Sequence, residues 1–431
     1  MYRRFLLVSL LVAAPMAAAA PKEWPQFRGP QGDGLALDAH PPTAFSDTHR
    51  VTWHTPVHGK AWASPVVGGG RVWLATATED ATELSVVALD AASGKVLRDR
   101  TLFRVAKPQF VHKFNSAASP TPLLAGNRVY VTFGSPGTAC LDAKSGNTLW
   151  ERRDIECNHY RGAGSSPILH QGKLILNFDG SDRQFLVALD AKDGHTVWKT
   201  QRGIDYKDLG PDGKPDSEGD WRKAFATCQI ATIDGVTQLL SQGAKAFYSY
   251  DPADGRERWR VEERTSHSAG TRPVVGHGLV FFPTGWSQGQ VLAVHPGNNG
   301  EVIDANASTP AATKLSIAWR TKRNVPKKPS LILLDDLLYG IDETGIATCW
   351  EAKTGTVVWN ERIGGNYSAA PVATREHLYF CSEEGRVTVV ATGRRFAKVA
   401  ANQLGDGFMA SPAIVGNALF LRSRSEVYRI D

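Results

Sequence analysis

The sequence predicts an all-β fold, an eight-bladed β-propeller whose blades are four-stranded antiparallel sheets. Three observations predict it. Units of short apolar strands recur with a period of roughly 40 to 60 residues, which is typical of propeller blades and not of helical solenoids. A turn of the form Asp-x-x-x-Gly followed by Trp recurs inside these units. Finally, 41 Gly and 24 Pro residues punctuate the chain, and stretches that favour helix are scarce.

The units open with a small residue followed by Pro, just before the first strand. The typical openings are Ser64-Pro65, Ser119-Pro120, Ser166-Pro167, Arg272-Pro273, Ala370-Pro371 and Ser411-Pro412. Two less typical units are expected to open near Thr227 and near Pro329. This spacing gives seven internal units and a shorter final one.

The Asp-x-x-x-Gly spacing has a physical cause. In Asp142–Gly146 the carboxylate can accept backbone N–H bonds inside a tight turn, and Gly can adopt the left-handed conformation that closes a hairpin. The same frame occurs at Asp90–Gly94, Asp190–Gly194, Asp251–Gly255 and Glu351–Gly355. Each of these frames therefore predicts the hairpin before an outer strand.

A Trp follows four residues after Gly in most units, and we expect it to fill the wedge between neighbouring blades. These residues are Trp150, Trp198, Trp259 and Trp359. A large flat ring of this kind buries on the order of 200 Å². Arg98 stands at this position in the first unit, and an insertion after His295 separates the fifth unit from Trp319.

The final unit, Ser411–Asp431, is too short to hold four strands. A lone strand with its own Trp lies at the other end of the chain, at Arg50–His54. Pairing the two would close the ring and remove two exposed sheet edges. We therefore expect an N-terminal strand to complete the last blade, which makes eight.

The first residues predict a secretory signal peptide over residues 1–19. Arg3 and Arg4 form a positive start, Phe5–Ala14 is an apolar stretch of ten, and small residues lead to a cleavage site after Ala19. Ten apolar residues are too few to span a bilayer. No Cys lies near this site, so we expect a periplasmic or secreted chain without a lipid anchor, with residues 20–431 forming a single propeller domain.

Charge and cysteine usage narrow the partners. Loss of Arg3 and Arg4 lowers the formal net charge from +6 to +4, too little to indicate nucleic acid or a membrane surface as a partner. The five Cys residues form no CxxC or adjacent pair, which favours buried free thiols, with Cys157–Cys228 the least implausible bridge. We expect a monomer without a transmembrane segment.

Ala188–Trp198 resembles the tryptophan-docking repeat of pyrroloquinoline quinone (PQQ) proteins. The opening Trp24–Pro30 and the stretches Asn115–Pro122 and Asn366–Pro371 are similar to those of exported PQQ-like propellers. The resemblance extends over residues 24–431. It implies the fold, but the same repeat serves quinoprotein dehydrogenases and a non-catalytic outer-membrane-assembly lipoprotein, so it implies no single activity.

The family's dehydrogenases are longer, many carry a vicinal Cys pair, and they hold calcium in a cradle of acidic and amide side chains beside a catalytic Asp. The sequence has no adjacent Cys residues, and no such cradle can be assigned. We therefore expect no cofactor, with PQQ and calcium entering only under an alternative function. Asp208, Asp212 and Asp216 faintly resemble a calcium loop, but a solvated surface loop is favoured.

The candidate site is one mouth of the central channel. The innermost strands of a propeller run in the same direction, so the loops that lead into them share a face and bring cations, amides and aromatic rings together. The candidate side chains are Lys60, Trp62, His112, Lys113, Asn115, His159, Tyr160, Arg161, Lys223, His267, Lys327 and Tyr367. They suit an anionic or sugar-like ligand, although many could instead pack between blades.

No catalytic motif is present, and the three histidines of this set lack metal-ligand spacing, so we expect neither a catalytic set nor a metal. The expected function is a non-catalytic exported scaffold that binds a partner protein, a glycan or a cell-envelope component. The alternative is a PQQ-dependent oxidoreductase. A hydrolase or lyase acting on polysaccharide lacks an evident acid–base pair.

Overall fold

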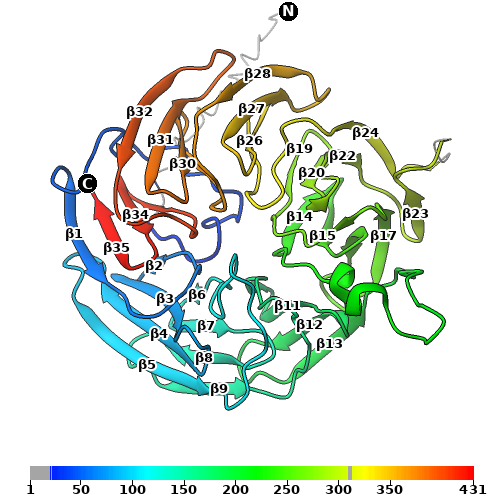
Figure 1. Cartoon of the computed structure of the whole chain (residues 1–431), viewed down its shortest axis with the longest axis horizontal. Helices are drawn as coiled ribbons and strands as arrows, with labels where there is room; N and C mark the ends of the chain where they lie inside the picture. The colour runs from blue at the N-terminus through cyan, green and yellow to red at the C-terminus, as the bar shows by residue number, and fades with distance from the viewer. Residues whose placement is uncertain (1–19, 21, 309–312) are drawn as a thin grey trace, which may run out of the picture.

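The computed structural model describes residues 20, 22–308 and 313–431 and confirms the eight-bladed β-propeller (Figure 1). The expected signal peptide lies outside the described residues. Blade 1 consists of β2 (Val66–Gly68), β3 (Arg71–Ala77), β4 (Glu83–Asp90) and β5 (Val96–Arg104). Blade 2 consists of β6 (Leu123–Ala125), β7 (Arg128–Thr132), β8 (Thr138–Asp142) and β9 (Thr148–Arg152). Blade 3 consists of β10 (Ile168–His170), β11 (Lys173–Asp179), β12 (Gln184–Asp190) and β13 (Thr196–Gln201). Blade 4 consists of β14 (Gln229–Ile233), β15 (Val236–Gln242), β16 (Ala246–Tyr250) and β17 (Glu257–Glu262).

The second half of the ring repeats this order. Blade 5 consists of β19 (Val274–Gly276), β20 (Leu279–Pro283), β22 (Val291–His295) and β24 (Ser316–Thr321). Blade 6 consists of β25 (Ile332–Leu334), β26 (Leu337–Ile341), β27 (Ile346–Glu351) and β28 (Val357–Arg362). Blade 7 consists of β29 (Val372–Ala373), β30 (His377–Cys381), β31 (Arg386–Ala391) and β32 (Lys398–Gln403). Blade 8 consists of β33 (Ala413–Val415), β34 (Ala418–Arg422), β35 (Glu426–Ile430) and β1 (Val51–Pro56).

The N-terminal strand closes the ring as predicted. Strand β1 pairs antiparallel with β35, with Val51 opposite Ile430 and Thr55 opposite Val427. Figure 1 shows β1 beside β35 at the C-terminus. Blade 8 is thus a composite of both ends of the chain.

The Asp-x-x-x-Gly turns form the predicted hairpins. The Asp142 Oδ1 atom accepts hydrogen bonds from the backbone N–H groups of Lys144 and Ser145 at 3.1 and 2.7 Å, and Gly146 has φ 74°. The hydrogen bond from the Ser145 backbone, followed by that from its hydroxyl, lowers the pKa of the Asp142 carboxyl. These turns connect the third and fourth strands of their blades.

The turns also explain the position of the Trp residues, because a Trp on the outer strand of one blade packs against the turn of the next blade. Trp198 is buried, and its Nε1 donates to the Pro252 carbonyl in the next blade at 3.3 Å. A Cβ on Gly255 would lie 2.6 Å from the Trp198 ring, so the turn glycine leaves room for it. Trp150 and Trp359 donate in the same way to Ala191 and Gly393. The predicted wedge role is confirmed.

Blade 4 departs from this pattern because of the insertion in blade 5. Within the insertion, β23 (Glu301–Asp304) adds a fifth strand to blade 4 by pairing parallel with β17. Trp259 accordingly donates to Gln238 Oε1 within its own blade, at 2.9 Å, and not to the next blade. Blade 5 has this insertion between β22 and β24 in place of an Asp-x-x-x-Gly turn, so no such turn receives the Trp259 N–H.

The opening of blade 2 lies two residues later than predicted. Ser119 bonds to Asn115 and Ser116 within its own loop. Thr121 instead occupies the place equivalent to Ser64 in blade 1, because its Oγ1 accepts the Ser64 N–H at 3.0 Å. The repeated Ser-Pro and Thr-Pro pairs in this stretch made the two registers look alike.

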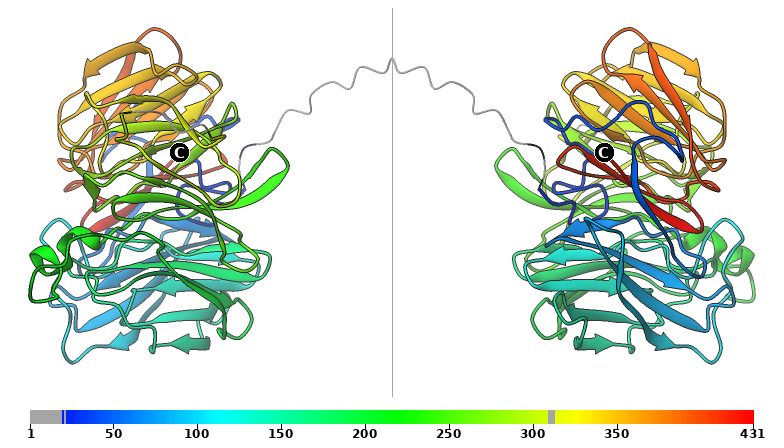
Figure 2. Two further views of the ribbon diagram at one scale, coloured as in Figure 1. Left: turned by 90° about the vertical axis from the view of Figure 1, so that its right-hand side faces the viewer. Right: turned by 90° about the vertical axis from the view of Figure 1, so that its left-hand side faces the viewer.

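The two faces of the ring carry different loops. Strands alternate in direction within a blade, so the loops into the first strands and the hairpins between second and third strands share one face, here called the mouth face. The Asp-x-x-x-Gly turns share the other, the far face. Figure 2 shows the 3₁₀ segment η1 (Asp216–Arg222), which leads into blade 4, on one face and the start of the described chain on the other.

The N-terminal segment Trp24–Gly34 closes the channel from the far face. It joins blades that are distant in sequence. On one side of the ring, Trp24 bridges to Val67 in blade 1 and the Pro25 carbonyl accepts from Leu124 N in blade 2. Further round, the Phe27 carbonyl accepts from Arg272, Arg28 donates to the Leu331 carbonyl, and the Gly34 carbonyl accepts from Ala373 N. Arg28 and Arg272 are buried inside the channel. A Cβ on Gly32 would lie 2.1 Å from Arg272 Cζ, so this crossing requires glycine.

All five cysteines are free and buried, as predicted. Burial raises the pKa of the Cys140 and Cys228 thiols, which keeps them protonated. Among the described residues, no helix is long and apolar enough to cross a membrane. The loop with calcium-like spacing is anchored by an ion pair, since buried Asp208 accepts from Arg222 Nε at 3.0 Å.

Candidate functional site

A cavity of about 950 Å³ occupies the mouth end of the channel. Loops and hairpins of the mouth face form its walls, and Phe27 of the N-terminal segment lines it as well. Its charged and aromatic lining residues are Phe27, Trp62, His112, Phe114, Arg161, Asp220, Lys223, Phe225, His267, Trp286, Lys327, Lys328, Glu343 and Glu383. Because the N-terminal segment crosses the far end, the channel mouth forms a recess of ligand size.

One wall is an ion cluster centred on Asp220, which lies in η1. Arg161 binds its carboxylate in bidentate fashion, at 3.0 Å from Nε and 2.7 Å from Nη2, and Lys223 Nζ donates to the same group. Burial would raise the pKa of the Asp220 carboxyl, but hydrogen bonds from Lys223 and Arg161 hold it below its usual value. Burial also lowers the pKa of Lys223, against the opposing effect of Asp220.

The opposite wall holds a second cluster from blades 6 and 7. Lys328 Nζ lies 3.1 Å from Glu383 Oε1 and 2.7 Å from Ser368 Oγ. Glu343 Oε1 accepts the backbone N–H groups of Lys327 and Lys328 at 2.5 and 2.8 Å, and burial raises the pKa of its carboxyl. Lys327 Nζ lies 4.7 Å from the centroid of the Trp286 ring. Its charge therefore faces an aromatic surface, and it has no ion pair among the described residues.

Aromatic side chains reach the cavity from both sides. Phe114 is 60% exposed and lines the cavity, with Lys113 Nζ 5.2 Å and Lys328 Nζ 6.0 Å from the centroid of its ring. Trp286 is 41% exposed and sits in β21 (Trp286–Ser287), which pairs with β18 (Ser266–His267). Large exposed rings beside cations can bind a planar or sugar-like body.

Two histidines border the Asp220 cluster. Burial, followed by the charge of nearby Lys223, lowers the pKa of His267 to about 4, and burial and Arg161 lower that of His112. His267 Nδ1 lies 2.9 Å from Ser268 Oγ, and His112 Nδ1 accepts the Phe114 N–H at 3.3 Å. Both rings are neutral at pH 7, so the fixed charge of the cavity comes from its lysines, arginine and carboxylates.

The structure brings together part of the predicted set. The residues that line the cavity are Trp62, His112, Asn115, Arg161, Lys223, His267 and Lys327. Asn115 ties two loops together, because its Nδ2 donates to the Arg161 carbonyl at 3.0 Å. Lys60 stacks on Trp62 and Lys113 on Phe114, while the Tyr160 ring lies beside Arg161 and Lys223, so these three surround the cavity without lining it.

Two predicted residues point into the protein interior. His159 is buried, packs against Phe178 with the two rings tilted by 37°, and accepts the Ser135 N–H with Nε2 at 2.9 Å. The chain turns at Tyr160, which has φ 60°, so that Arg161 reaches the cavity while His159 lies beneath the loop. Tyr367 is fully buried and donates to the Gly364 carbonyl at 3.0 Å.

The sequence reasoning missed the three carboxylates and Trp286. Glu343, Glu383 and Trp286 lie in hairpins between second and third strands, whereas the predicted residues all belong to loops that lead into first strands. The alternation of strand direction was a signal for them, because it places these hairpins on the mouth face. Asp220, three residues before Lys223, could have been found as its local partner.

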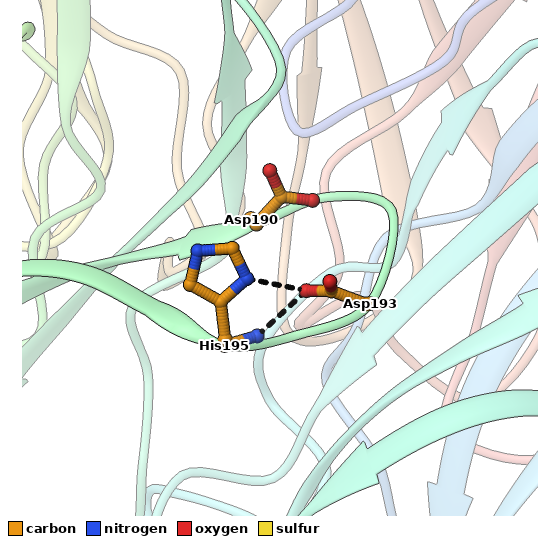
Figure 3. Close-up of side chains that lie close together, drawn as sticks. All are labelled: Asp190, Asp193 and His195. Atoms are coloured by element: carbon orange, nitrogen blue, oxygen red, sulfur yellow. Dashed lines mark hydrogen bonds and ion pairs between the residues drawn. The ribbon is translucent and has the colours of Figure 1, made fainter.

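A group of donors that could hold a metal ion lies elsewhere. Asp190, Asp193 and His195 have ligand atoms within 4.8 Å of one another, on the hairpin between β12 and β13 (Figure 3). This is an Asp-x-x-x-Gly turn of the far face. His195 Nδ1 and the His195 N–H both contact Asp193 Oδ1, at 2.6 and 3.1 Å, so turn geometry accounts for the group.

With the fold and the cavity established, comparisons with known proteins give the family. A family model described as outer membrane protein assembly factor BamB matches residues 85–361 and 187–431. The chain belongs to this family. Among solved structures, BamB from Moraxella catarrhalis has a TM-score of 0.58 at 12% identity, covering 88% of this chain and 99% of its own. The predicted PQQ-like propeller is thereby confirmed.

Dehydrogenases also resemble the chain. A europium-containing methanol dehydrogenase has a TM-score of 0.66 at 13% identity, covering 95% of this chain and 98% of its own. The quinohemoprotein alcohol dehydrogenase ADH IIB of Pseudomonas putida is 25% identical over 64% of this chain and 40% of its own length. A polyvinylalcohol dehydrogenase of Pseudomonas sp is 22% identical over 67% and 52%. The chain thus spans about half, or less, of these two curated relatives.

These relatives correct one expectation. The sequence led us to expect no cofactor, on the grounds that adjacent Cys residues and a calcium cradle were missing. Proteins named quinohemoproteins and a europium-containing dehydrogenase share the fold and repeat, so that expectation is wrong as a conclusion from this sequence. The two features we searched for do not decide whether a propeller of this kind carries a cofactor.

Proposed function

We propose that the mouth cavity binds an organic anion, such as an acidic sugar, and that the chain serves as an exported non-catalytic binding scaffold. One observation carries this proposal. Four cations line the cavity, Arg161, Lys223, Lys327 and Lys328, against three carboxylates. Of these four cations, Lys327 is the one without an ion pair among the described residues, and Asp220 occupies only the Nε and Nη2 edge of Arg161. These two groups can hold a carboxylate or phosphate through charge-assisted hydrogen bonds.

The state of the carboxylates supports a binding role over catalysis. Asp220 is engaged by Arg161 and Lys223, Glu383 by Lys328 and Ser368, and Glu343 by two backbone N–H groups. A general base needs a free carboxylate within hydrogen-bond reach of a substrate proton. Here each carboxylate instead orients a lysine, an arginine or a loop.

A quinone-dependent oxidoreductase is the second candidate, favoured by the dehydrogenase relatives. The cations and the Trp286 ring fit the body of a planar anionic quinone such as PQQ. The donor set does not fit a metal beside it, because among the described residues no three His, Cys, Asp or Glu ligand atoms converge at the cavity. A PQQ–calcium pair would require the carboxylates to leave their present partners.

We further propose that residues 1–19 are a cleaved signal peptide and that residues 20–431 act as a single monomeric domain in the periplasm or outside the cell. The BamB family match supports a role in the cell envelope, where a protein or glycan partner could present the anion.

Calorimetric titration of the purified chain tests this function. Galacturonate and galactose share a ring and differ in the carboxylate, so saturable binding of galacturonate with at least ten-fold weaker binding of galactose is expected. Lys327→Ala should weaken galacturonate binding about ten-fold, since a charge-assisted hydrogen bond contributes roughly 1.5–3 kcal/mol. Lys192→Ala, an exposed residue of a far-face turn, is the control.

A parallel titration with PQQ and Ca²⁺ separates the two candidates. A 1:1 complex that reduces a dye with an alcohol or aldose would replace the scaffold with the oxidoreductase. Equal affinity for galactose and galacturonate, unchanged by Lys327→Ala, would contradict the anion site itself.

A further inference from the structure

Part of the cavity wall is a run of hydroxyl groups that link neighbouring blades. They lie just before the first strands of blades 8, 1, 2, 3 and 4. Each hydroxyl accepts the backbone N–H of the equivalent residue in the preceding blade. The bonds are Ala370 N to Ser411 Oγ at 2.9 Å, Ser411 N to Ser64 Oγ at 3.0 Å, Ser64 N to Thr121 Oγ1 at 3.0 Å, Thr121 N to Ser166 Oγ at 2.9 Å and Ser166 N to Thr227 Oγ1 at 3.0 Å.

These five residues form what we call the hydroxyl arc, Ser411, Ser64, Thr121, Ser166 and Thr227, running from blade 8 to blade 4. All five line the cavity and all are more than nine-tenths buried. A hydroxyl has one hydrogen to donate and two lone pairs. The N–H of the preceding blade uses a lone pair of each, and no described protein atom accepts the hydrogen of any of the five.

Buried hydroxyl groups with an uncommitted hydrogen require an acceptor. We propose that the hydroxyl arc receives an oxyanion, a carboxylate, phosphate or sulfate group of the ligand other than the one that Lys327 and Arg161 hold. The proposal rests on the anion-binding function above and adds a second anionic group to the ligand. The body of the ligand then extends from the arc toward Trp286 and Lys327, which line the same cavity.

The chemistry of the arc favours an oxyanion over a cation. The inter-blade N–H bond takes one of the two lone pairs of each hydroxyl, which weakens it as a metal ligand and leaves its hydrogen free to donate. An oxyanion instead needs several donors around it, which the arc offers from five consecutive blades. Each donor is fixed in place by its own inter-blade bond, so little order must be created on binding.

The arc has natural gaps that provide a test. In blade 5 the equivalent residue is Arg272, whose guanidinium turns toward the Phe27 carbonyl, and in blade 7 it is Ala370. Ala370 lines the cavity beside Ser411. Ala370→Ser would therefore add a sixth donor next to the arc without removing any existing inter-blade bond.

The experiment uses selenate as a probe of a single oxyanion. Crystals of the full mature chain are soaked in sodium selenate, and the anomalous signal locates selenium. A peak within hydrogen-bond distance of two or more arc hydroxyls is expected. In solution, Thr227→Val should weaken sulfate binding about ten-fold, Thr227→Ser should retain it, and Ala370→Ser should strengthen it several-fold.

The alternatives are distinguishable from failure of the anion site. Selenium bound at Arg161 or Lys327 alone, with Thr227→Val equal to wild type, would overturn the arc and leave the proposed function standing. Loss of galacturonate binding in Lys327→Ala together with unchanged sulfate binding would support an arc that works independently of the rim. An arc filled by water alone at saturating selenate would also overturn the proposal, whatever the galacturonate titration shows.

Discussion

At the far end of the channel, Arg28 and Arg272 are buried and donate to backbone carbonyls, whereas at the mouth Arg161 and Lys328 are partly exposed and paired with carboxylates. Burial lowers the pKa of Arg28 to about 9 and that of Arg272 to about 10. A carbonyl cannot leave or change its charge, so the far end is a permanent closure. A carboxylate partner can be shared with, or exchanged for, an incoming anion.

The difference shows where the fold is fixed and where it can bind. The segment Trp24–Gly34 ties blades that are hundreds of residues apart, through backbone groups that any ligand would have to displace. The mouth loops are held by side chains whose charges nearly balance. Substitutions at the far end should therefore act on stability, and those at the mouth on ligand binding.

The largest expected effect is that of Arg28→Ala. It removes hydrogen bonds to the Leu331 and Gly32 carbonyls, at 2.5 and 3.3 Å, and to Asp33 O, and it leaves a cavity in the closed end. Buried polar groups left without partners and the lost packing should together cost about 3–5 kcal/mol. Thermal unfolding measures the loss.

Arg161→Ala is the matched substitution at the mouth. Lys223 continues to pair with Asp220, and Arg161 is partly exposed, so the cost should stay within about 1 kcal/mol. Similar losses of stability in both variants would contradict the division between a structural end and a binding end.

The second prediction compares two glycines that have the same backbone conformation. Gly32 at the far end has φ 73° and Gly213 in a mouth-face loop has φ 72°. Alanine is strained at both, by about 1–2 kcal/mol. Only at Gly32 would the new Cβ also overlap a buried side chain, at 2.1 Å from Arg272 Cζ, whereas nothing lies within 4 Å at Gly213.

Gly32→Ala should therefore lower the melting temperature clearly more than Gly213→Ala, and the difference between them measures the packing of the closure alone. Equal shifts would mean that Arg272 can move aside without cost, and that the far end is looser than its contacts indicate.

The local features of this fold were predictable from sequence, whereas its long-range side-chain contacts were not. Asp142 and Gly146 make their turn from bonds within four residues, so spacing alone reveals it. Arg28 donates to a residue 303 positions away, and no local pattern announces that contact. The composite blade was predictable because two incomplete units leave only one way to complete the ring.

The candidate site shows the same limit. Loops into first strands identified Arg161 and Lys223, but their partner Asp220 was not among the predicted residues. His159 and Arg161 are two residues apart on either side of Tyr160, which has a positive φ, and of the two only Arg161 lines the cavity. Sequence locates a mouth loop; the orientation of each side chain depends on turns that hydrophobic patterns do not specify.

The smallest expected effect is the contribution of His267, at the mouth end, to the pH dependence of stability. Burial, and then the charge of Lys223, lowers the pKa of His267 to about 4 in the folded chain, below the value of about 6.5 for an unfolded one. The unfolded chain therefore binds the proton first. The stability contribution is complete above pH 6.5 and is lost as the pH falls toward 4. The arginines of the far end do not titrate in this range.

The melting temperature should accordingly fall between pH 7.5 and pH 5, and His267→Gln should reduce that fall by about 2–4 °C. His40→Gln, an exposed histidine outside the cavity, is the control and should leave the fall unchanged. A bound anion beside Lys223 would reduce the positive field at His267, so galacturonate should shrink the pH dependence in the wild type and have little such effect in His267→Gln. A pH profile that His267→Gln does not alter would show that His267 does not contribute to the pH dependence of stability.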